Sequence, residues 1–242
     1  MHYYFITGTS QGIGKALAER ALQEKESQVY GYSRSQSLEH SRYTHTTVDL
    51  SDIASLTAQV NTFFPVLEQA EKIVLINNAG TLGEVKYLGS LDDERVAQLF
   101  NLNVTAPTVL MNHFIRAYQD TPAEKLIINV SSGAGKYPVD GWSGYCASKA
   151  ALDMVSQVAA LELEKKGKSN FKVFALAPGV VDTRMQGEIR KIDEQDFSNL
   201  DKFKQYKANG ELDDPTHTAD KFFQLIEQPG QFAEVLQDVR KF

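Results

Sequence analysis

The chain has 242 residues, of which 42% are hydrophobic and 23% charged, a composition typical of a globular protein with one sizeable core and not of a disordered or collagen-like chain. A count of 25 Lys and Arg against 31 Asp and Glu gives a net charge of −6 with no basic run, so no nucleic-acid partner is expected. The single cysteine, Cys146, excludes an intrachain disulfide. Together with a start that lacks the features of a signal peptide, it indicates a cytoplasmic protein. No apolar run approaches the roughly 20 residues that cross a bilayer, so no membrane association is expected.

Short apolar runs alternate along the chain with longer amphipathic stretches, the pattern of strand–helix units around a parallel sheet. Strands are predicted at residues 2–6, 28–33, 44–48, 72–77, 124–130, 171–176 and 234–238. Helices are predicted at about 13–25, 52–62, 92–118, 144–166 and 216–228. Pro107 lacks an amide donor and is expected to bend or interrupt its helix. No linker or repeat divides the chain, so we predict a single α/β domain, a Rossmann-type doubly wound parallel sheet of about seven strands with helices on both faces.

The segment 184–212 departs from this rhythm because it is polar and charged and lies between a strand and a late helix. Two interpretations fit such a segment, a mobile lid over a ligand site or a surface excursion without a role. Long insertions near ligand sites favour the lid.

A glycine-rich turn, TGTSQGIG at residues 7–14, follows the first predicted strand and precedes a helical pattern. Glycines let a backbone turn tightly and approach a pyrophosphate, whose charge is then held by amide groups at the helix N-terminus. A strand–helix connection that uses glycine without any ligand is the alternative. The cofactor-binding residues predicted in this turn are Gly8, Ser10, Gln11, Gly12, Ile13 and Gly14.

A basic residue stands where a dinucleotide site distinguishes its cofactor, roughly 20 residues after the last glycine. Arg34 occupies that position between Ser33 and Ser35, and no acid occurs from Val29 to Leu38. A guanidinium pairs with a 2′-phosphate through two hydrogen bonds, so NADP(H) is predicted rather than NAD(H). A solvated loop arginine is the alternative interpretation.

The run Tyr145-Cys146-Ala147-Ser148-Lys149 places a tyrosine and a lysine on one face of a predicted helix. Lowering a phenol pKa from near 10 to about 7 requires roughly 4 kcal/mol, which Lys149 and an oxidised nicotinamide could supply together. Ser132 ends an apolar strand thirteen residues before Tyr145, and strand ends line the ligand crevice of a doubly wound sheet. Taken alone, each of these residues could be a surface or turn residue.

These features, together with Asn77-Asn78-Ala79-Gly80, Asn103 in NLNVTAP and Pro178-Gly179 followed by Thr183, resemble the short-chain dehydrogenase/reductase family from residue 7 to residue 183. The resemblance implies a Rossmann-type reductase. In it, Tyr145 would protonate the carbonyl oxygen and Ser132 would polarise that oxygen. Lys149 would orient the cofactor ribose and depress the tyrosine pKa, and Asn103 would hold a water that relays protons to Lys149.

The same resemblance implies further cofactor contacts along the chain. Asp49 would touch the adenine, Asn78 to Gly80 would line the nucleotide, and Val181 and Thr183 would bind the carboxamide. As alternatives, Asn77 and Asn78 could be turn formers and Asp49 a helix cap. The full set of implied contacts is Asp49, Leu50, Asn78, Ala79, Gly80, Tyr145, Lys149, Pro178, Gly179, Val181 and Thr183.

Within the family, the stretches SSGAGKYPVDGWSGYCASKA, APGVVDTRMQ and FSNLDKF resemble the bacterial benzil reductases, which reduce one ketone of an aromatic 1,2-diketone to an (S)-hydroxyketone. The sepiapterin reductases are similar too, but they place an acid in the last strand, where this chain has Gln237 with Asp238 one residue beyond. A one-residue step turns a side chain to the other face, which favours the diketone. The substrate pocket is expected at Ser132, Lys136, Tyr137, Pro138, Trp142, Met185 and Gln186, although Tyr137 and Trp142 could equally be packing residues.

The sequence supports three further expectations, on catalysis, metal binding and assembly. A non-catalytic NADPH-binding sensor is the rival from another class, but the four proposed catalytic residues are all present. A metal enzyme is not expected, because His2, His40, His45, His113 and His217 show no paired ligand spacing. The long helices at 92–118 and 144–166 correspond to the family's subunit interface, so the resemblance implies a homodimer or homotetramer. The expected partner is a small-molecule carbonyl substrate.

Overall fold

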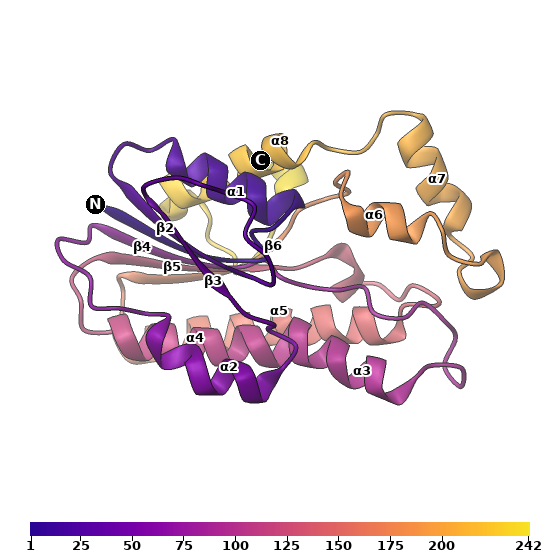
Figure 1. Cartoon of the computed structure of the whole chain (residues 1–242), viewed down its shortest axis with the longest axis horizontal. Coiled ribbons are helices and arrows are strands. Elements are labelled where there is room, and N and C mark those ends of the chain that lie inside the picture. The colour runs from indigo at the N-terminus through magenta and orange to yellow at the C-terminus, as the bar shows by residue number, and fades with distance from the viewer.

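The fold is built on one parallel sheet of seven strands in the order β3-β2-β1-β4-β5-β6-β7. A computed structural model describes residues 1–242. Figure 1 shows the sheet lying between two layers of helices. The prediction of a single Rossmann-type α/β domain is confirmed. The strands are β1 (His2–Thr7), β2 (Ser27–Ser33), β3 (Tyr43–Thr47), β4 (Lys72–Asn77), β5 (Glu124–Val130), β6 (Phe171–Ala177) and β7 (Leu236–Asp238).

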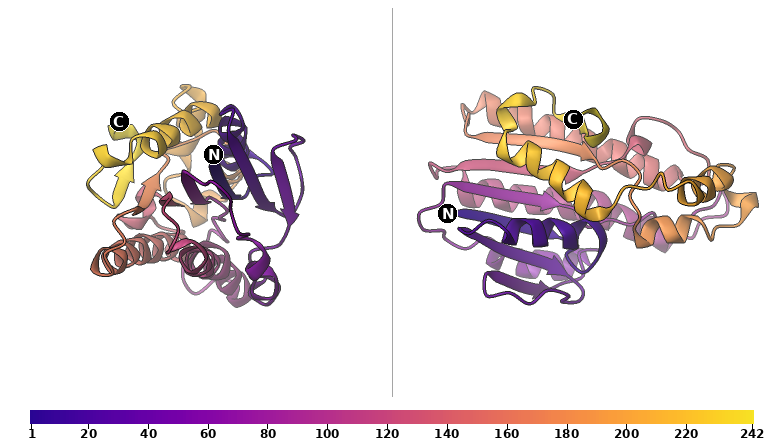
Figure 2. Two further views of the ribbon diagram at one scale, coloured as in Figure 1. Left: turned by 90° about the vertical axis from the view of Figure 1, so that its left-hand side faces the viewer. Right: turned by 90° about the horizontal axis from the view of Figure 1, so that it is seen from above.

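Helices cover both faces of the sheet because the strands carry apolar side chains on both sides. On one face lie α1 (Gly12–Leu22) and α8 (Pro215–Glu227), side by side in the right-hand view of Figure 2. Arg20 joins them, 3.1 Å from Asp220 and 3.0 Å from Glu227. The other face is covered by α2 (Ile53–Gln59), α3 (Asp93–Phe100), α4 (Ala106–Tyr118) and α5 (Ser143–Lys165).

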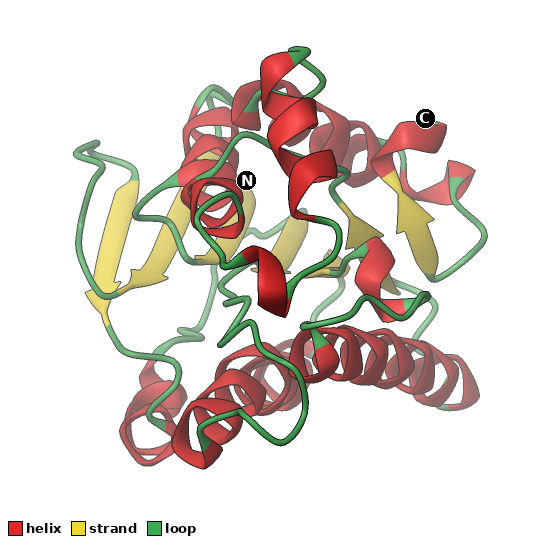
Figure 3. Cartoon of the chain, turned by 90° about the vertical axis from the view of Figure 1, so that its right-hand side faces the viewer, coloured by secondary structure: helices red, strands yellow, loops and turns green.

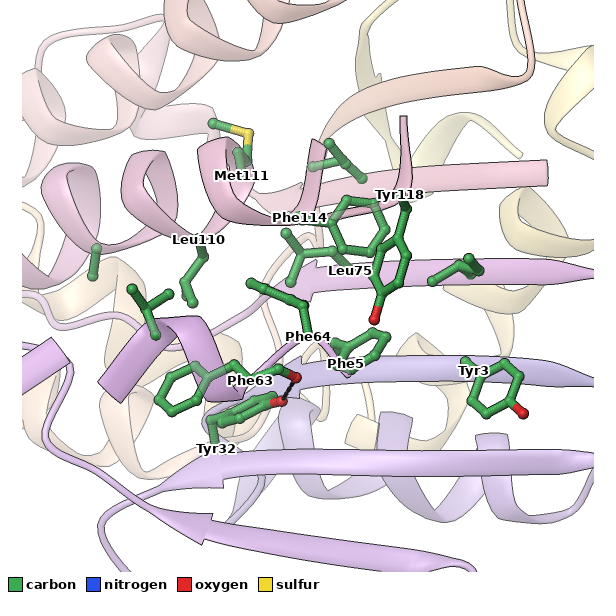
Figure 4. Close-up of a cluster of buried hydrophobic side chains, with 14 of the residues drawn as sticks. Tyr3, Phe5, Tyr32, Phe63, Phe64, Leu75, Leu110, Met111, Phe114 and Tyr118 are labelled. Atoms are coloured by element: carbon green, nitrogen blue, oxygen red, sulfur yellow. Dashed lines mark hydrogen bonds between the residues drawn. The ribbon is translucent and has the colours of Figure 1, made fainter. Parts of the chain in front are cut away.

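Successive strand residues divide between two cores, since side chains alternate across a sheet. Phe5 belongs to the core under α2, α4 and α5, whereas its neighbour Ile6 belongs to the core under α1 and α8. The first core is rich in aromatic rings (Figure 4): the Phe64 and Phe114 centroids are 5.7 Å apart, and Tyr118 lies 5.2 Å from Phe114. Edge-to-face packing of this kind fixes how the helices sit on the sheet.

The predicted helix at 92–118 is a continuous helical stretch of three segments, in which a π-helical turn separates two α-helices. Between α3 and α4 lies a π-helical turn, Asn101–Thr105, and Pro107 stands in the first turn of α4. A proline ring clashes with the carbonyl four residues back, so the helix widens just ahead of it. The expected interruption is therefore a change of winding and not a break. The wide turn carries Asn103, which is buried.

The segment 184–212 folds beyond the carboxyl ends of the strands, as Figures 1 and 3 show. It contains α6 (Arg184–Ile189), a 3₁₀ turn (Glu194–Asp196) and α7 (Leu200–Ala208). Between the last two, Phe197 is fully buried and stacks on Trp142 at 5.1 Å. No helix in the structure is both long and apolar enough to span a membrane.

Candidate functional site

A cavity of about 470 Å³ opens at the carboxyl ends of β1 to β6, large enough for a small-molecule ligand. It lies where the strand order reverses between β1 and β4, the crevice in which doubly wound sheets bind their ligands. Its wall includes the glycine turn, the ends of β2 and β5, the start of α5 and the start of α6.

The glycine turn forms one side of the cavity and is built around two residues with positive φ. Gly8 has φ +74° and Gly12 has φ +57°, and a Cβ on Gly8 would lie 2.8 Å from the Asn78 side-chain nitrogen. Only glycine therefore fits at Gly8, where the turn packs on the residues after β4, and the turn leads into the N-terminus of α1, the kind of position at which phosphate groups bind. Gly14 does not line the cavity: a Cβ there would be 2.3 Å from the Gly8 oxygen, so it brings the helix close to the turn. The predicted residues that do line it here are Gly8, Ser10, Gln11, Gly12 and Ile13.

The turn is tied to the neighbouring strand end by Thr7. Its hydroxyl oxygen accepts hydrogen bonds from the amides of Asn78 and Ala79, both at 2.9 Å, and its carbonyl accepts one from the Asn78 side chain at 2.9 Å. Asn78 therefore both links the end of β1 to the loop after β4 and lines the cavity. Five residues predicted on this side line the cavity: Asn78, Ala79, Gly80, Pro178 and Thr183.

Arg34 and Asp49 line the outer end of the cavity, together with Ser33 and Leu50. Arg34 is exposed. The hydrogen bond from the Ser51 side chain lowers the pKa of Asp49 against the opposing effect of burial, and Arg34 adds to the lowering. Asp49 is not the cap of α2, because that role belongs to Asp52, which accepts from the Ser55 amide at 3.0 Å.

Tyr145 and Lys149 face the inner end of the cavity from successive turns of α5. Both are buried, with 8% and 6% of their surface exposed. The Lys149 ammonium lies 5.7 Å from the centre of the tyrosine ring and donates to the Val130 carbonyl at 2.8 Å. The predicted pair is therefore brought together against the end of β5, and both side chains line the cavity.

The ionisation of this pair differs from the sequence-based expectation. Burial raises the pKa of Tyr145, while the Ser132 side chain opposes that rise. Burial also lowers the pKa of Lys149 to about 8, with Asp153 acting in the other direction. Desolvation disfavours both charged forms, so the protein's own groups do not make the phenol acidic.

Neither Asn103 nor Ser132 lines the cavity, although the Ser132 side chain lies beside the Tyr145 phenol. The Asn103 amide donates to the Thr81 carbonyl at 2.8 Å and to the Ser148 hydroxyl at 3.1 Å, and its oxygen accepts from the Thr81 amide at 2.9 Å. A Cβ on Gly80 would lie 3.3 Å from that oxygen and 3.7 Å from the Lys149 nitrogen. Asn103 therefore fixes the loop after β4 beside Lys149.

Three other predicted cofactor residues do not line the cavity. The Ser35 carbonyl accepts from the Ser33 hydroxyl at 2.9 Å and so shapes the turn that carries Arg34. Gly179 has φ +77° and packs on Arg240. Val181 is buried and pairs with Asp213.

Of the residues predicted for the substrate pocket, Met185 lines the cavity and the others do not. Trp142 packs in an aromatic cluster, edge-on to Tyr145 at 5.5 Å and stacked on Phe197. Gln186 is buried, and its side-chain oxygen accepts from Arg190 at 2.9 Å. The remaining three are exposed beside the catalytic segment: Lys136, Tyr137 and Pro138.

Several cavity residues were missed by the sequence analysis. Ser131 could have been found, because it ends β5 and strand ends line the crevice. Gln98 and Leu102 could not, since they come from α3 and the π turn and carry no motif. The missed residues are Tyr32, Val48, Ser51, Thr81, Leu82, Gln98, Leu102, Val130, Ser131, Arg184 and Glu188.

The glycine turn, the helix N-terminus and the long cavity across the switch point fit a dinucleotide. The fold and this site therefore define a nucleotide-binding protein of the doubly wound α/β class. Comparison with known proteins narrows the class. A family model described as short chain dehydrogenase matches residues 3–194.

Similar proteins agree with the model. A benzil reductase ((S)-benzoin forming) of Bacillus cereus is 36% identical over 237 residues and covers 94% of both chains. A sepiapterin reductase of Meriones unguiculatus is 32% identical, over 92% of this chain and 90% of that one. The crystal structure of a short chain dehydrogenase/reductase from Saccharomyces cerevisiae is 25% identical with a TM-score of 0.85, over 99% of this chain and 96% of that one. The chain belongs to the short-chain dehydrogenase/reductase family. It is an oxidoreductase that acts on carbonyl or alcohol groups with a nicotinamide cofactor.

Proposed function

We propose that the protein is an NADPH-dependent carbonyl reductase that converts one ketone of an aromatic 1,2-diketone to a hydroxyketone. One observation carries the proposal: a single cavity joins the glycine turn and Arg34 at its outer end to Tyr145 and Lys149 at its inner end. The cavity is thus arranged to hold a dinucleotide along its length and a carbonyl group beside the phenol.

The proposed cofactor is NADP(H), held by the glycine turn at its phosphates and by Arg34 at its 2′-phosphate. Arg34 is exposed at the rim, on the turn that the Ser33 hydroxyl shapes by donating to the Ser35 carbonyl. Lys149 at the inner end is placed to bind ribose hydroxyls. When bound, the cofactor supplies the hydride.

Tyr145 is the proposed general acid. Its phenol gives its proton to the carbonyl oxygen as the C–H bond forms, while Ser132, which lies beside it, donates a hydrogen bond to the same oxygen. Lys149 stabilises the phenolate left behind, and Asn103 holds the loop after β4 beside Lys149 through its bonds to Thr81. Burial raises the pKa of Tyr145, so the phenol carries the proton that this step requires.

The diketone is favoured over the pterin by the end of β7. Asp238, and not Gln237, is the buried residue there, and Arg240 holds its carboxylate at 2.9 Å and 2.5 Å through two nitrogens. A carboxylate already engaged in two charged hydrogen bonds is a poor anchor for a pterin. The Bacillus cereus relative, named for reducing benzil, supports the same choice.

Three further expectations belong to this proposal. The segment 184–212 acts as a substrate lid, since Met185 reaches the cavity and Phe197 anchors the segment on Trp142. Met154, Val158 and Leu161 form an exposed apolar stripe on α5, which supports a homodimer or homotetramer. A cytoplasmic location stays a prediction.

The test is an NADPH-oxidation assay with benzil, other diketones, sepiapterin, simple ketones and secondary alcohols. We expect turnover with benzil, none with sepiapterin, and a hydroxyketone product on chiral chromatography. Turnover with sepiapterin alone would assign the pterin role instead. NADPH binding without oxidation by any carbonyl would identify a non-catalytic sensor.

A further inference from the structure

A buried carboxylate that the proposed chemistry does not use lies directly behind the catalytic pair. Asp153 is on α5, one helical turn after Lys149, and only 5% of its surface is exposed. It accepts a hydrogen bond from the Ser131 hydroxyl. A buried charge is costly unless neighbouring groups stabilise it, so its position calls for a function.

Two hydrogen bonds fasten successive turns of α5 to successive residues at the end of β5. Lys149 donates to the Val130 carbonyl at 2.8 Å, and one turn later Asp153 accepts from Ser131. The next residue along the chain is Ser132, the proposed partner of the carbonyl oxygen. The distance between Ser132 and Tyr145 therefore depends on how firmly these two bonds hold the strand end to the helix.

The turn that follows Ser132 packs against the same carboxylate. A Cβ on Gly135 would lie 3.0 Å from Asp153 Oδ2, and 3.0 Å and 3.1 Å from the backbone of Lys149 and Ala150. The Ser132 hydroxyl in turn accepts from the Ala134 amide at 3.2 Å. Asp153 thus contacts the chain on both sides of Ser132.

The charges around Asp153 come from three elements. Lys149 lies on the same helix, Lys136 follows the turn after Ser132, and Ser131 donates a hydrogen bond from the end of β5. Burial raises the pKa of Asp153, and these three groups oppose the rise. Asp153 in turn raises the pKa of Lys149 against burial. Tyr145 lies one helical turn before Lys149, with its ring centre 5.7 Å from the Lys149 ammonium.

We propose that Asp153 is a positioning residue that holds the Ser131–Ser132 strand end against α5 and whose carboxylate supports the Lys149 ammonium from one helical turn away. The inference rests on the proposed function, because it assigns Asp153 to the support of Lys149 and Ser132 in that reaction. Charge and hydrogen bonding are separable here. Asp153→Asn keeps the acceptor and removes the charge, whereas Ser131→Ala keeps the charge and removes the donor.

The first measurement is an NMR titration of Lys149 in the protein alone, with the signal assigned through Lys149→Arg. In Asp153→Asn, the midpoint should fall by about one pH unit, because a nearby opposite charge shifts a pKa by that order. The alkaline limb of kcat/KM for carbonyl reduction should move with it. In Ser131→Ala, the midpoint should move less while kcat falls about tenfold. An unchanged Lys149 midpoint in a folded Asp153→Asn protein overturns the inference.

A second variant covers the case in which Asp153→Asn does not fold. Asp153→Glu keeps the charge but displaces the acceptor, so the Lys149 midpoint should be kept while kcat falls. A kcat equal to that of the parent protein would contradict the positioning role. A parent protein that reduces no carbonyl, yet whose Lys149 midpoint moves in Asp153→Asn, would defeat the proposed function and leave the charge coupling standing.

Discussion

The two ends of the cavity are built from different physical environments. At the inner end, Tyr145 and Lys149 are almost wholly buried, and burial shifts the pKa of each. At the outer end, Arg34 is exposed to solvent. Charges in the buried end act on one another with little screening, whereas a charge at the rim is screened by water and salt.

For the proposed NADPH-dependent reductase, this difference would separate the rate of the reaction, set at the inner end, from the choice of cofactor, set at the outer end. Substitutions at the inner end alter proton transfer and are expected to change kcat by orders of magnitude. Substitutions at the outer end alter how one phosphate is held and are expected to change cofactor affinity by a smaller factor. The experiments below follow that order of effect.

The largest effect is expected from Tyr145→Phe, which removes the proposed acid and leaves the ring that packs on Trp142. Carbonyl reduction should fall about a thousandfold, as loss of a general acid does, because no other proton donor is held at that point. The dissociation constant for NADPH, measured by fluorescence titration, should stay within about twofold.

Tyr137→Phe is the matched control, since Tyr137 is 71% exposed and does not line the cavity. Its turnover should equal that of the parent protein. If Tyr145→Phe also kept the parent's turnover, proton transfer would not take place at the inner end. The proposal that the inner end sets the rate and the outer end sets the cofactor preference would then be wrong.

The next effect concerns pH and tests the buried lysine. Burial lowers the pKa of Lys149 to about 8, so the ammonium is present below that pH and is lost as the pH rises through it. NADPH should therefore bind about tenfold more weakly well above pH 8 than at pH 7, because one charged hydrogen bond to the ribose becomes neutral. The measurement is a series of NADPH dissociation constants across this range.

Lys149→Met should bind NADPH weakly at every pH, and its dissociation constant should show no change around pH 8. A titration of the parent protein that is flat across pH 8 would show that Lys149 does not contact the cofactor through its charge.

At the outer end, Arg34→Asp should weaken NADPH binding by up to about tenfold, because a solvent-screened charged pair is replaced by a repulsion, and should leave NADH binding nearly unchanged. Arg34→Ala removes the pairing without adding a repulsion, so its affinity for NADPH should lie between those of the parent protein and Arg34→Asp. The ratio of kcat/KM for the two cofactors checks this, and the parent's preference for NADPH should decrease with added salt. A ratio that does not move in either variant would remove Arg34 from cofactor recognition.

The sequence predicted most of this arrangement where a residue's role follows from local pattern. Apolar runs placed β1 to β6 within a residue or two, and the YxxxK spacing brought Tyr145 and Lys149 to one face of α5. The glycine turn was equally plain, because positive φ at Gly8 and Gly12 limits the residue choice.

The rest depends on contacts between distant segments. α6 and α7 were not predicted because they are short and polar, and burial of Phe197 on Trp142 stabilises this region instead. Asp153 looks like any acid on a helix until Ser131 is brought beside it. The raised pKa of Tyr145 likewise follows from burial, and the sequence spacing of Tyr145 and Lys149 does not predict how deeply they are buried.

The smallest effect is expected where the proposed lid meets the body. The Asp140 carboxylate accepts from the Ser198 amide and hydroxyl, both at 2.9 Å, from Asn199 at 3.3 Å and from Tyr87 at 3.1 Å. Burial alone would raise the pKa of Asp140, but the Ser198 and Tyr87 donors outweigh it and lower the pKa, so this anchor is present at neutral pH and is lost only as the solution becomes acidic.

Asp140→Ala should therefore loosen the start of α7 by about 1 kcal/mol, the usual contribution of such hydrogen bonds, while leaving the buried pair at Tyr145 untouched. Faster amide exchange confined to residues 198–208 and a severalfold rise in KM for the diketone at unchanged kcat are the expected results. Tyr87→Phe removes one exposed donor and should change neither. A fall in kcat in Asp140→Ala would contradict this prediction. It would mean that the lid also positions Tyr145, through the contacts of Trp142 with both.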